Sequence, residues 1–376
     1  MIPFKNTYKD KKVLVTGHTG FKGSWLSLWL DSMGAEVHGI SDEIPTIPSH
    51  FETAELAGII NHQLLDVRDY EAVKKVVSDI RPDFIFHLAA QPLVPESYAN
   101  PLKTFEVNVM GTGSILETIR TADFPCSVVF ITSDKCYDNV EWTYGYRETD
   151  ALGGKDPYSG SKGAAELIIK SYFHSFFAGQ SDRLRMGIGR AGNVIGGADW
   201  AADRIVPDCI RSWSKGEVVQ IRSPHATRPW QHVLEPLSGY LILGQRLHAE
   251  LNGESFPGGS VHGEAYNFGP DAVQNITVGE LIESMRAHWE GVRWDDVSET
   301  NNAGHEAGLL KLCCDKALHG LHWKACLNYD QMVKFTVDWY RDFYASSGES
   351  TQELSRKQIQ EYMEAALKNQ LSWITD

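Results

Sequence analysis

Short apolar segments alternate with amphipathic stretches along the first half of the chain. The apolar runs predict strands at Lys12–Thr16, Glu36–Ile40, Asn61–Asp66, Phe84–Ala89, Ser127–Thr132 and Leu184–Arg190. The intervening stretches predict helices at Phe21–Met33, Tyr70–Ile80, Val107–Ala122 and Pro157–Phe177. Because strands that alternate with helices pair in parallel and are covered on both faces, this half predicts an α/β fold with a Rossmann-type, doubly wound parallel sheet.

A glycine-rich loop joins the first predicted strand to the first predicted helix. Residues 16–23 read Thr-Gly-His-Thr-Gly-Phe-Lys-Gly and space their glycines as GxxGxxG. Residues without a Cβ let the backbone approach a pyrophosphate, and the helix N-terminus offers it free N–H groups. The same string also occurs in ordinary strand-to-helix turns, but its place directly after the first strand favours a dinucleotide site.

Residues at the ends of other strands fit the remainder of a dinucleotide. The Asp66 carboxylate closes the third strand and can accept from an adenine amino group or cap the next helix. Ser41 or Asp42 faces the ribose, and no arginine stands at 41–44 to hold a 2′-phosphate, so NAD is the expected cofactor. The expected cofactor-binding residues are Gly17, His18, Thr19, Gly20, Phe21, Lys22, Gly23, Asp66, Val67, Leu88, Ala89, Ala90, Thr132, Tyr158 and Lys162.

The regular alternation ends after the last predicted strand. The next stretch is rich in Arg, Trp, Pro and His, and helical patterns dominate the later part of the chain. We therefore expect residues 1–196 to form the dinucleotide-binding domain, with a segment at about 228–245 returning to it. Residues 197–347 are expected to form a smaller substrate-binding region, and residues 348–376 predict a polar, solvated amphipathic helix.

The composition excludes several classes of protein. The chain has 376 residues and 42% apolar content, enough to bury a sizeable core. Its net charge of −14 repels phosphate backbones, which argues against nucleic-acid binding. It has no signal-peptide pattern and no apolar run of about 18 residues, so no membrane association is expected. Six scattered cysteines lack zinc-site spacing, so we expect no metal site and a reducing, cytoplasmic location.

Tyr158 and Lys162 form a candidate catalytic pair. They stand four residues apart on a predicted helix, so their side chains share one face. A tyrosine with an ordinary pKa near 10 acts as a base only if its phenolate is stabilised, as a neighbouring ammonium and a positive nicotinamide ring can do. The spacing alone is common on exposed helices, but the glycine loop upstream favours an oxidoreductase step.

A second polar cluster follows the predicted strand Ser127–Thr132. Ser133, Asp134 and Lys135 lie at the sheet edge where ligands bind in open parallel sheets. The Ser133 hydroxyl can bind the reacting oxygen, and a simple dehydrogenase needs no more than that. The adjoining acid and amine indicate further proton transfers, although the same composition also occurs in solvated turns.

These segments resemble the CDP-D-glucose 4,6-dehydratases, a group within the extended short-chain dehydrogenase/reductase family. The resemblance runs from about Lys11 to Phe343. It is carried by TGHTGFKGSWL (16–26), HLAAQPLV (87–94), NVMGT (108–112), TSDKCY (132–137), GYRE (145–148), PYSGSKGAAEL (157–167), RAGNVIGGADWA (190–201) and RPWQHVLEPLSGYL (228–241). The related dTDP-glucose dehydratases have Asp-Glu where this chain has Asp134-Lys135, and Gly160 stands where the group usually has Asn.

The resemblance implies an internal redox dehydration of CDP-glucose to CDP-4-keto-6-deoxyglucose and water, with NAD recycled in each turnover. Tyr158, assisted by Lys162, deprotonates the C4 hydroxyl in this scheme, and Asp134 protonates the departing C6 hydroxyl. Lys135 is the predicted base at C5, which requires a pKa well below about 10.4. The alternative is that Lys135 stabilises the enolate while water acts as the base.

The resemblance also implies a substrate site and an assembly. The expected substrate-binding residues are Gln91, Ser133, Asn193, Arg204, Arg222 and Arg228, with Arg204 and Arg228 as the pyrophosphate candidates. Helices at 107–122 and 157–177 resemble the pair that builds a homodimer in this family, and the product is expected to enter deoxysugar synthesis of the lipopolysaccharide O-antigen type.

Three other functions stay open from the sequence. Another nucleotide-sugar 4,6-dehydratase shares most of these features. A 4-epimerase does not need the acid–amine pair Asp134-Lys135. A non-catalytic dinucleotide-sensing regulator has no need of Tyr158 and Lys162, both of which are present.

Overall fold

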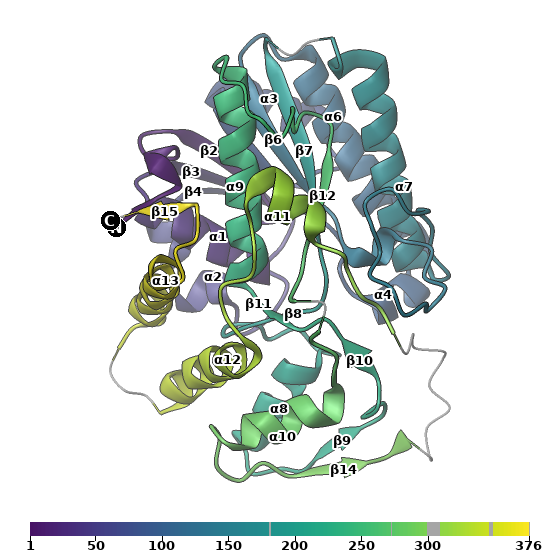
Figure 1. The fold of residues 1–376 in the computed structure, drawn as a ribbon, viewed down its shortest axis with the longest axis vertical. Helices are drawn as coiled ribbons and strands as arrows, with labels where there is room; N and C mark the ends of the chain where they lie inside the picture. The colour runs from purple at the N-terminus through teal and green to yellow at the C-terminus, as the bar shows by residue number, and fades with distance from the viewer. Residues whose placement is uncertain (180–181, 272, 299–308, 346–348, 376) are drawn as a thin grey trace.

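A seven-stranded parallel sheet forms the centre of the molecule, in the order β12-β7-β6-β5-β2-β3-β4 (Figure 1). The computed structural model describes residues 1–179, 182–271, 273–298, 309–345 and 349–375. The strands are β2 (Lys12–Thr16), β3 (Glu36–Ser41), β4 (Asn61–Leu64), β5 (Phe84–His87), β6 (Cys126–Ile131), β7 (Leu184–Ala191) and β12 (Ala265–Phe268). Successive strands run outward in opposite directions from β2 and β5, which places a topological switch point between them.

Helices cover both faces of the sheet. α1 (Phe21–Ser32) and α9 (Leu234–Leu251) share a core with Val13 and Val15 of β2. Leu14 points to the opposite face and joins the core beneath α3 (Tyr70–Ile80), α6 (Gly111–Thr121) and α7 (Pro157–Tyr172). This alternation follows from the two-residue period of a strand, and it confirms the predicted doubly wound α/β fold.

Several elements differ from the sequence prediction. The helix predicted at Val107–Ala122 begins earlier, as α4 (Val94–Ala99), α5 (Pro101–Phe105) and a π-helical turn η3 (Glu106–Met110) that leads into α6. The helix predicted to end at Phe177 ends at Tyr172 and continues as the π-turn η5 (Phe173–Phe177). β12 was not predicted, because its four residues carry no alternating pattern of their own and gain order by pairing with β7.

A smaller lobe lies below the carboxyl ends of the strands in Figure 1. Its elements are β8 (Val194–Ile195), α8 (Ile205–Trp213), β9 (Val219–Ile221), β10 (Thr227–Arg228), β11 (Gln231–His232), β13 (Ile276–Thr277), α10 (Val278–Arg286) and β14 (Trp294–Asp296). The chain returns to the sheet through α9, which packs on β6 and β7. The residue boundaries expected between the two regions stay a prediction.

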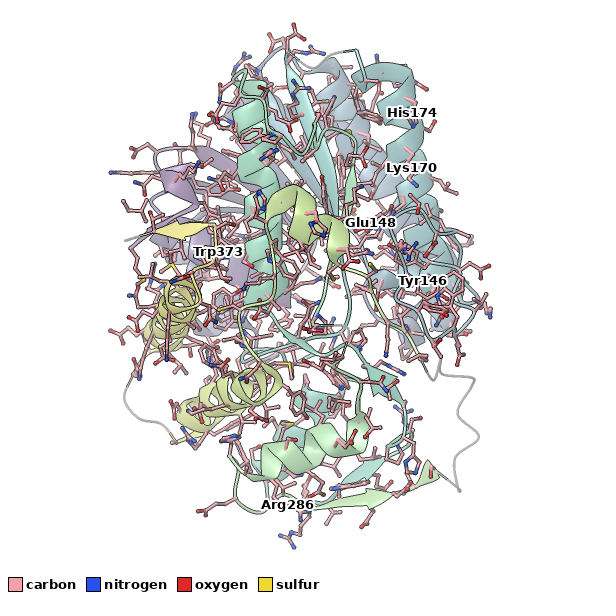
Figure 2. All side chains as sticks on the ribbon, viewed as in Figure 1. Tyr146, Glu148, Lys170, His174, Arg286 and Trp373 are labelled. Atoms are coloured by element: carbon pink, nitrogen blue, oxygen red, sulfur yellow. The ribbon has the colours of Figure 1, made fainter. Side chains whose placement is uncertain are left out.

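The C-terminal segment packs against the first helix of the chain. α12 (Tyr329–Tyr344) contacts α13 (Thr351–Lys368), α13 contacts α1, and β15 (Ile374–Thr375) pairs with β1 (Ile2–Pro3). Trp373, labelled in Figure 2, stacks on Phe4 with ring centroids 4.9 Å apart. α13 was predicted to be solvated, but Leu354, Ile359 and Tyr362 are buried, because its few apolar residues fall on one helical face.

The remaining short elements are η1 (Phe4–Asn6), α2 (His50–Thr53), η2 (Leu56–Gly58), η4 (Asp134–Cys136) and α11 (Asp315–Leu321). Among the described residues, every helix is too short or too polar to span a bilayer.

Candidate active site

The glycine loop between β2 and α1 is shaped by its missing side chains. Gly17 has a φ of +76°, and a Cβ there would lie 2.8 Å from the Ala89 nitrogen. A Cβ on Gly23 would lie 2.0 Å from the Gly17 carbonyl oxygen, so only glycine lets the helix start this close to the loop. At Gly20 the nearest atom to a built Cβ is 3.4 Å away. The cradle therefore fits a pyrophosphate in front of the N-terminus of α1.

His18 and Thr19 hold the loop against the end of β3. His18 is fully buried, its Nδ1 lies 3.0 Å from the Ser41 hydroxyl, and its Nε2 lies 3.2 Å from Nδ1 of His62. Burial lowers the pKa of His18 to about 4, so this ring is neutral near pH 7. The Thr19 hydroxyl donates to the Glu43 carbonyl (2.6 Å). The His18 and Thr19 side chains thus bind protein groups, and the Thr19 nitrogen donates to the Ser41 hydroxyl (3.3 Å), which leaves the N–H groups of the first turn of α1 to face a cofactor.

The residues expected around the adenosine are partly committed to protein contacts. The Asp66 carboxylate accepts from Arg68 at Nε (2.9 Å) and Nη2 (2.6 Å), and this pairing lowers its pKa. Val67 is buried against Gly111. An adenine amino group at Asp66 would share the carboxylate with Arg68, a partner two residues away that the sequence analysis did not identify.

The segment after β5 lies against the glycine loop. The backbone nitrogens of Leu88 and Ala89 donate to the carbonyl and the hydroxyl of Thr16, each at 3.1 Å. Ala90 follows, half-buried. Gln91, expected to bind substrate, is buried instead, and its amide donates to the Leu93 carbonyl (3.0 Å) and the Thr104 hydroxyl (2.9 Å). The Gln91 side chain therefore shapes the loop from within.

Tyr158 and Lys162 project from the first two turns of α7. The Asp156 carboxylate caps this helix by accepting from the Ser159 nitrogen (2.9 Å). Lys162 Nζ lies 5.9 Å from the centre of the Tyr158 ring, and both side chains are at least nine-tenths buried. Burial raises the pKa of Tyr158 to about 12 and lowers that of Lys162 to about 8. The protein alone therefore does not stabilise the Tyr158 phenolate, and the bound cofactor and substrate have to supply most of that stabilisation.

Ser133 and Asp134 form a tight turn beside this pair. The Ser133 hydroxyl donates to Asp134 Oδ1 (2.9 Å), accepts from the Lys135 nitrogen (3.2 Å) and acts to lower the pKa of Tyr158. Asp134 is 3% exposed, and burial raises its pKa. Within the described residues its Oδ2 has no hydrogen-bond partner, and it faces Gly192. Asp134 is thus a buried acid with one oxygen open to a ligand.

Three distant cations converge on the same cluster. Lys22 Nζ lies 3.4 Å from the Tyr240 hydroxyl, and burial together with the charges of Lys162 and Arg204 lowers its pKa to about 7. The charge of Arg204 acts on Tyr158, and that of Arg228 acts on Asp134. Lys22 was expected only as part of the phosphate loop, but it reaches the reacting pair because α1 begins beside α9.

The other residues expected to bind substrate differ in how far they are buried. Arg204 is held by Asp199 (2.9 Å), and Arg228 is 6% exposed. The carbonyl of half-buried Asn193 accepts from the Gln231 nitrogen (3.1 Å). Arg222 is about half exposed and pairs with Asp203 at 3.8 Å.

Thr132 and Lys135 flank the acid. The Thr132 hydroxyl donates to the Glu166 carboxylate (2.7 Å), so of this residue only the backbone is left to face a cofactor. Lys135 is half-buried, and its charge acts on Asp134.

Comparison with known proteins agrees with this geometry. A family model described as GDP-mannose 4,6 dehydratase matches residues 14–336. The chain belongs to this family. It is 44% identical over 371 residues to the CDP-glucose 4,6-dehydratase of Salmonella typhimurium, covering 97% of this chain and 99% of that protein. The resemblance expected from the motifs is thereby confirmed.

Solved structures with the same overall fold are also similar to this chain. A UDP-glucose 4-epimerase of Thermotoga maritima superposes with a TM-score of 0.73 at 20% identity, covering 88% of this chain and 99% of that one. A dTDP-glucose 4,6-dehydratase of Streptomyces venezuelae, solved with NAD bound, gives 0.70 at 22% identity and covers 88% and 97%. At these identities the likeness establishes the fold.

Proposed function

We propose that this protein is an NAD-dependent lyase that converts CDP-glucose to CDP-4-keto-6-deoxyglucose and water. The observation that carries the proposal is the buried Asp134 carboxyl, which accepts from the Ser133 hydroxyl (2.9 Å) and whose charge acts on Tyr158. An oxidation site and a buried acid therefore share one reacting centre. An epimerase needs only the first, and the 44% identity to a CDP-glucose 4,6-dehydratase supports the second.

NAD is the cofactor; when bound, it would supply the hydride acceptor for oxidation at C4 and the hydride donor for reduction at C6. The glycine loop would hold its pyrophosphate, and Lys162 would bind the nicotinamide ribose. Ser41 ends β3, where its hydroxyl accepts from the Thr19 nitrogen (3.3 Å), and no arginine stands at 41–44 to hold a 2′-phosphate, which favours NAD over NADP. The Gly17 and Gly20 backbone fits this assignment because no side chain fills the space before α1.

The proton transfers fall to the chain's own residues. Tyr158 takes the proton of the C4 hydroxyl, with Ser133 binding the same oxygen. The resulting 4-keto group acidifies C5–H, and Lys135 removes that proton. Asp134 donates its proton to the C6 oxygen, which departs as water and leaves a C5–C6 double bond. Hydride then adds at C6, and Lys135 returns the proton to C5. The raised pKa of Asp134 suits this role, because it keeps the carboxyl protonated at a higher pH than usual.

Binding and assembly complete the proposal. Arg204 and Arg228 hold the pyrophosphate of CDP-glucose, with Asn193 beside them. The enzyme is a homodimer, supported by exposed apolar residues at Leu102, Met110 and Leu167 on the helical layer of α5 to α7. We also propose a cytoplasmic location, supported by six free cysteines, and a role in lipopolysaccharide deoxysugar synthesis.

A substrate panel tests the proposed function. Purified protein is incubated separately with CDP-, dTDP-, UDP- and GDP-glucose and with GDP-mannose, and the 4-keto product is detected by its absorbance in alkali. We expect product from CDP-glucose alone, and none from a Tyr158→Phe variant. Turnover of another nucleotide sugar in preference to CDP-glucose would contradict the proposal.

A further inference from the structure

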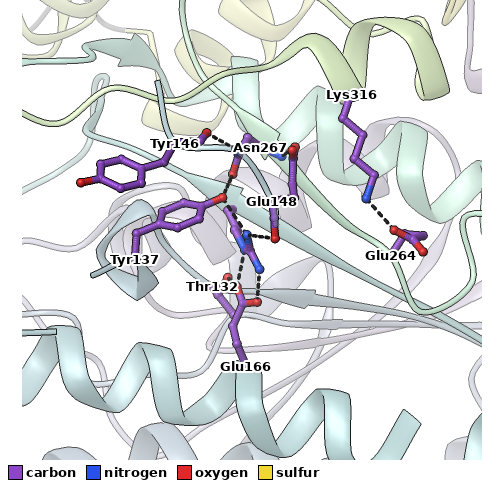
Figure 3. A network of polar contacts seen from close by, with 9 residues as sticks. Thr132, Tyr137, Tyr146, Glu148, Glu166, Glu264, Asn267 and Lys316 are labelled. Atoms are coloured by element: carbon purple, nitrogen blue, oxygen red, sulfur yellow. Dashed lines mark hydrogen bonds and ion pairs between the residues drawn. The ribbon is translucent and has the colours of Figure 1, made fainter. Parts of the chain in front are cut away.

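A buried ion pair lies beneath the catalytic turn, between β7 and α7. The Arg190 Nε donates to Glu166 Oε1 (2.6 Å), a second bond joins the Nη2 and Oε2 atoms, and both side chains are completely buried (Figure 3). Moving two charges out of water is costly, and apolar residues can often replace such a pair without loss of stability. Whether the Arg190–Glu166 pair has a role other than stability must therefore be judged from the groups that it contacts.

The pair holds both ends of the segment that carries the acid. On one side, the Thr132 hydroxyl donates to Glu166 Oε1 (2.7 Å). On the other, Arg190 Nη1 donates to the Tyr137 hydroxyl (2.6 Å). Ser133, Asp134 and Lys135 lie between these two anchors. A displacement of either anchor would move the intervening turn.

A second set of contacts fixes Tyr137 from the opposite direction. Its hydroxyl donates to Asn267 Oδ1 (2.7 Å) on β12, and its ring stacks on that of Tyr146 at 5.1 Å. The Asn267 nitrogen donates to the Glu148 carboxylate (2.8 Å), and the Glu148 carbonyl accepts from Arg190 (3.2 Å). Figure 3 shows these groups as one connected network.

Glu166 belongs to the same helix as the redox pair. It lies one turn beyond Lys162 and two turns beyond Tyr158 in α7. We propose that Arg190 and Glu166 are positioning residues that hold Asp134 in register with Tyr158, so that elimination follows oxidation in the same bound substrate. The effect on elimination rests on the proposed function, whereas the anchoring of the turn by Arg190 and Glu166 does not depend on it.

Two conservative variants test the positioning role. Thr132→Val and Tyr137→Phe each remove one hydroxyl from the network and keep the shape of the side chain. We expect hydride transfer to NAD to be retained and dehydration to slow by about tenfold, the worth of one hydrogen bond to a charged group. In a stopped-flow turnover, bound NADH should therefore accumulate well above the wild-type level.

Tyr362→Phe is the matched control. It also removes a buried tyrosine hydroxyl that bonds a charged group, here the carboxylate of Glu235 (2.9 Å), but at α13. Its NADH transient should equal that of the wild type, even if its melting temperature falls. A transient equal to that of the wild type in Thr132→Val and Tyr137→Phe, with only a loss of stability, would show that the network is merely structural.

Hydrogen exchange supplies a readout without substrate. In Tyr137→Phe, protection should fall in the peptide spanning 133–137, whereas in Tyr362→Phe it should fall around 326–328. Unchanged exchange at 133–137 would overturn the proposal. If the wild type itself fails to convert CDP-glucose, the proposed function is wrong, while the exchange data still decide whether the pair anchors the turn.

Discussion

Burial moves the pKa values of Asp134 and Tyr158, the two residues on which the Ser133 hydroxyl acts, in the same direction. Both pKa values are raised, so Tyr158 carries its proton near neutral pH, and Asp134 keeps its proton to a higher pH than an ordinary carboxyl does. A protonated Asp134 is ready to donate to a leaving hydroxyl. A protonated Tyr158 must first be activated, which ties its ionisation to the arrival of cofactor and substrate.

Replacing the acid should separate oxidation from dehydration. Asp134→Asn keeps the side chain's size but removes its proton, and we expect the formation of 4-keto-6-deoxy product to fall by about 10² to 10⁴-fold. Hydride transfer at C4 should persist, because Tyr158 and Lys162 are unchanged. Single-turnover absorbance of NADH measures the first step, and the alkali assay measures the second. Equal losses in both steps would contradict the acid role.

The role of Lys135 is tested by isotope exchange at C5. In Lys135→Met we expect incorporation of solvent deuterium at C5 to fall by about 10²-fold or more, since a missing base slows proton removal directly. Mass spectrometry of the product and of recovered substrate measures it. Exchange at the wild-type rate would sink the base assignment and leave Lys135 as an enolate-stabilising charge.

Residue-scale prediction from the sequence succeeds where chemistry is local. The four-residue spacing of Tyr158 and Lys162 and the turn at Ser133 and Asp134 place these groups together, as the structure does. The approach of Lys22 to Tyr240 joins residues 218 positions apart. No periodicity reports such a contact, because it depends on how α1 and α9 pack beside each other on one face of the sheet.

At the scale of elements, helices and strands with a strong sequence pattern were predicted well, and those with a weak pattern were not. The strand Lys12–Thr16 and the helix Tyr70–Ile80 match their predicted bounds. β12 and the buried face of α13 depend on tertiary partners, since four residues in one case and a sparse apolar stripe in the other carry little signal.

One buried carboxylate connects α9 to the C-terminal segment. Glu235 is 2% exposed and accepts from the nitrogens of Cys326 (2.9 Å) and Leu327 (2.7 Å) and from the Tyr362 hydroxyl. Burial raises its pKa to about 7, and these hydrogen bonds lower it by less. The folded protein therefore holds a proton there that the unfolded chain releases near pH 4.5.

This difference predicts a pH dependence of stability. The contribution of Glu235 is fully present below about pH 4.5 and falls by about 3 kcal/mol as the pH rises to about 7, because the folded state binds more protons in that window. Glu235→Gln cannot ionise, so its free energy of unfolding relative to the wild type should rise with pH. Urea unfolding at a series of pH values measures the difference, and parallel curves would contradict it.

The net charge of the whole molecule is negative, whereas cations gather around the reacting cluster. The chain carries −14, yet Lys22, Lys162, Arg204 and Arg228 all act on the reacting cluster. Such a focused positive field attracts a pyrophosphate while the remaining surface repels polyanions. The composition argues against nucleic-acid binding on electrostatic grounds, but the location of the positive site depends on the fold.

The exposed apolar surface of the α5–α7 layer argues for a second copy of the chain as its partner. Leu102 is 78% exposed and Leu167 is 57% exposed, on helices that contact each other. We expect a dimer by light scattering in the micromolar range, and a monomer for Leu167→Glu, because a buried unpaired charge costs several kcal/mol at an interface. Ile47→Glu, at a 93% exposed residue outside this layer, is the control and should leave the dimer intact. A monomeric wild type would contradict the assembly, and loss of the dimer in both variants would show a general effect of charge rather than a contact at Leu167.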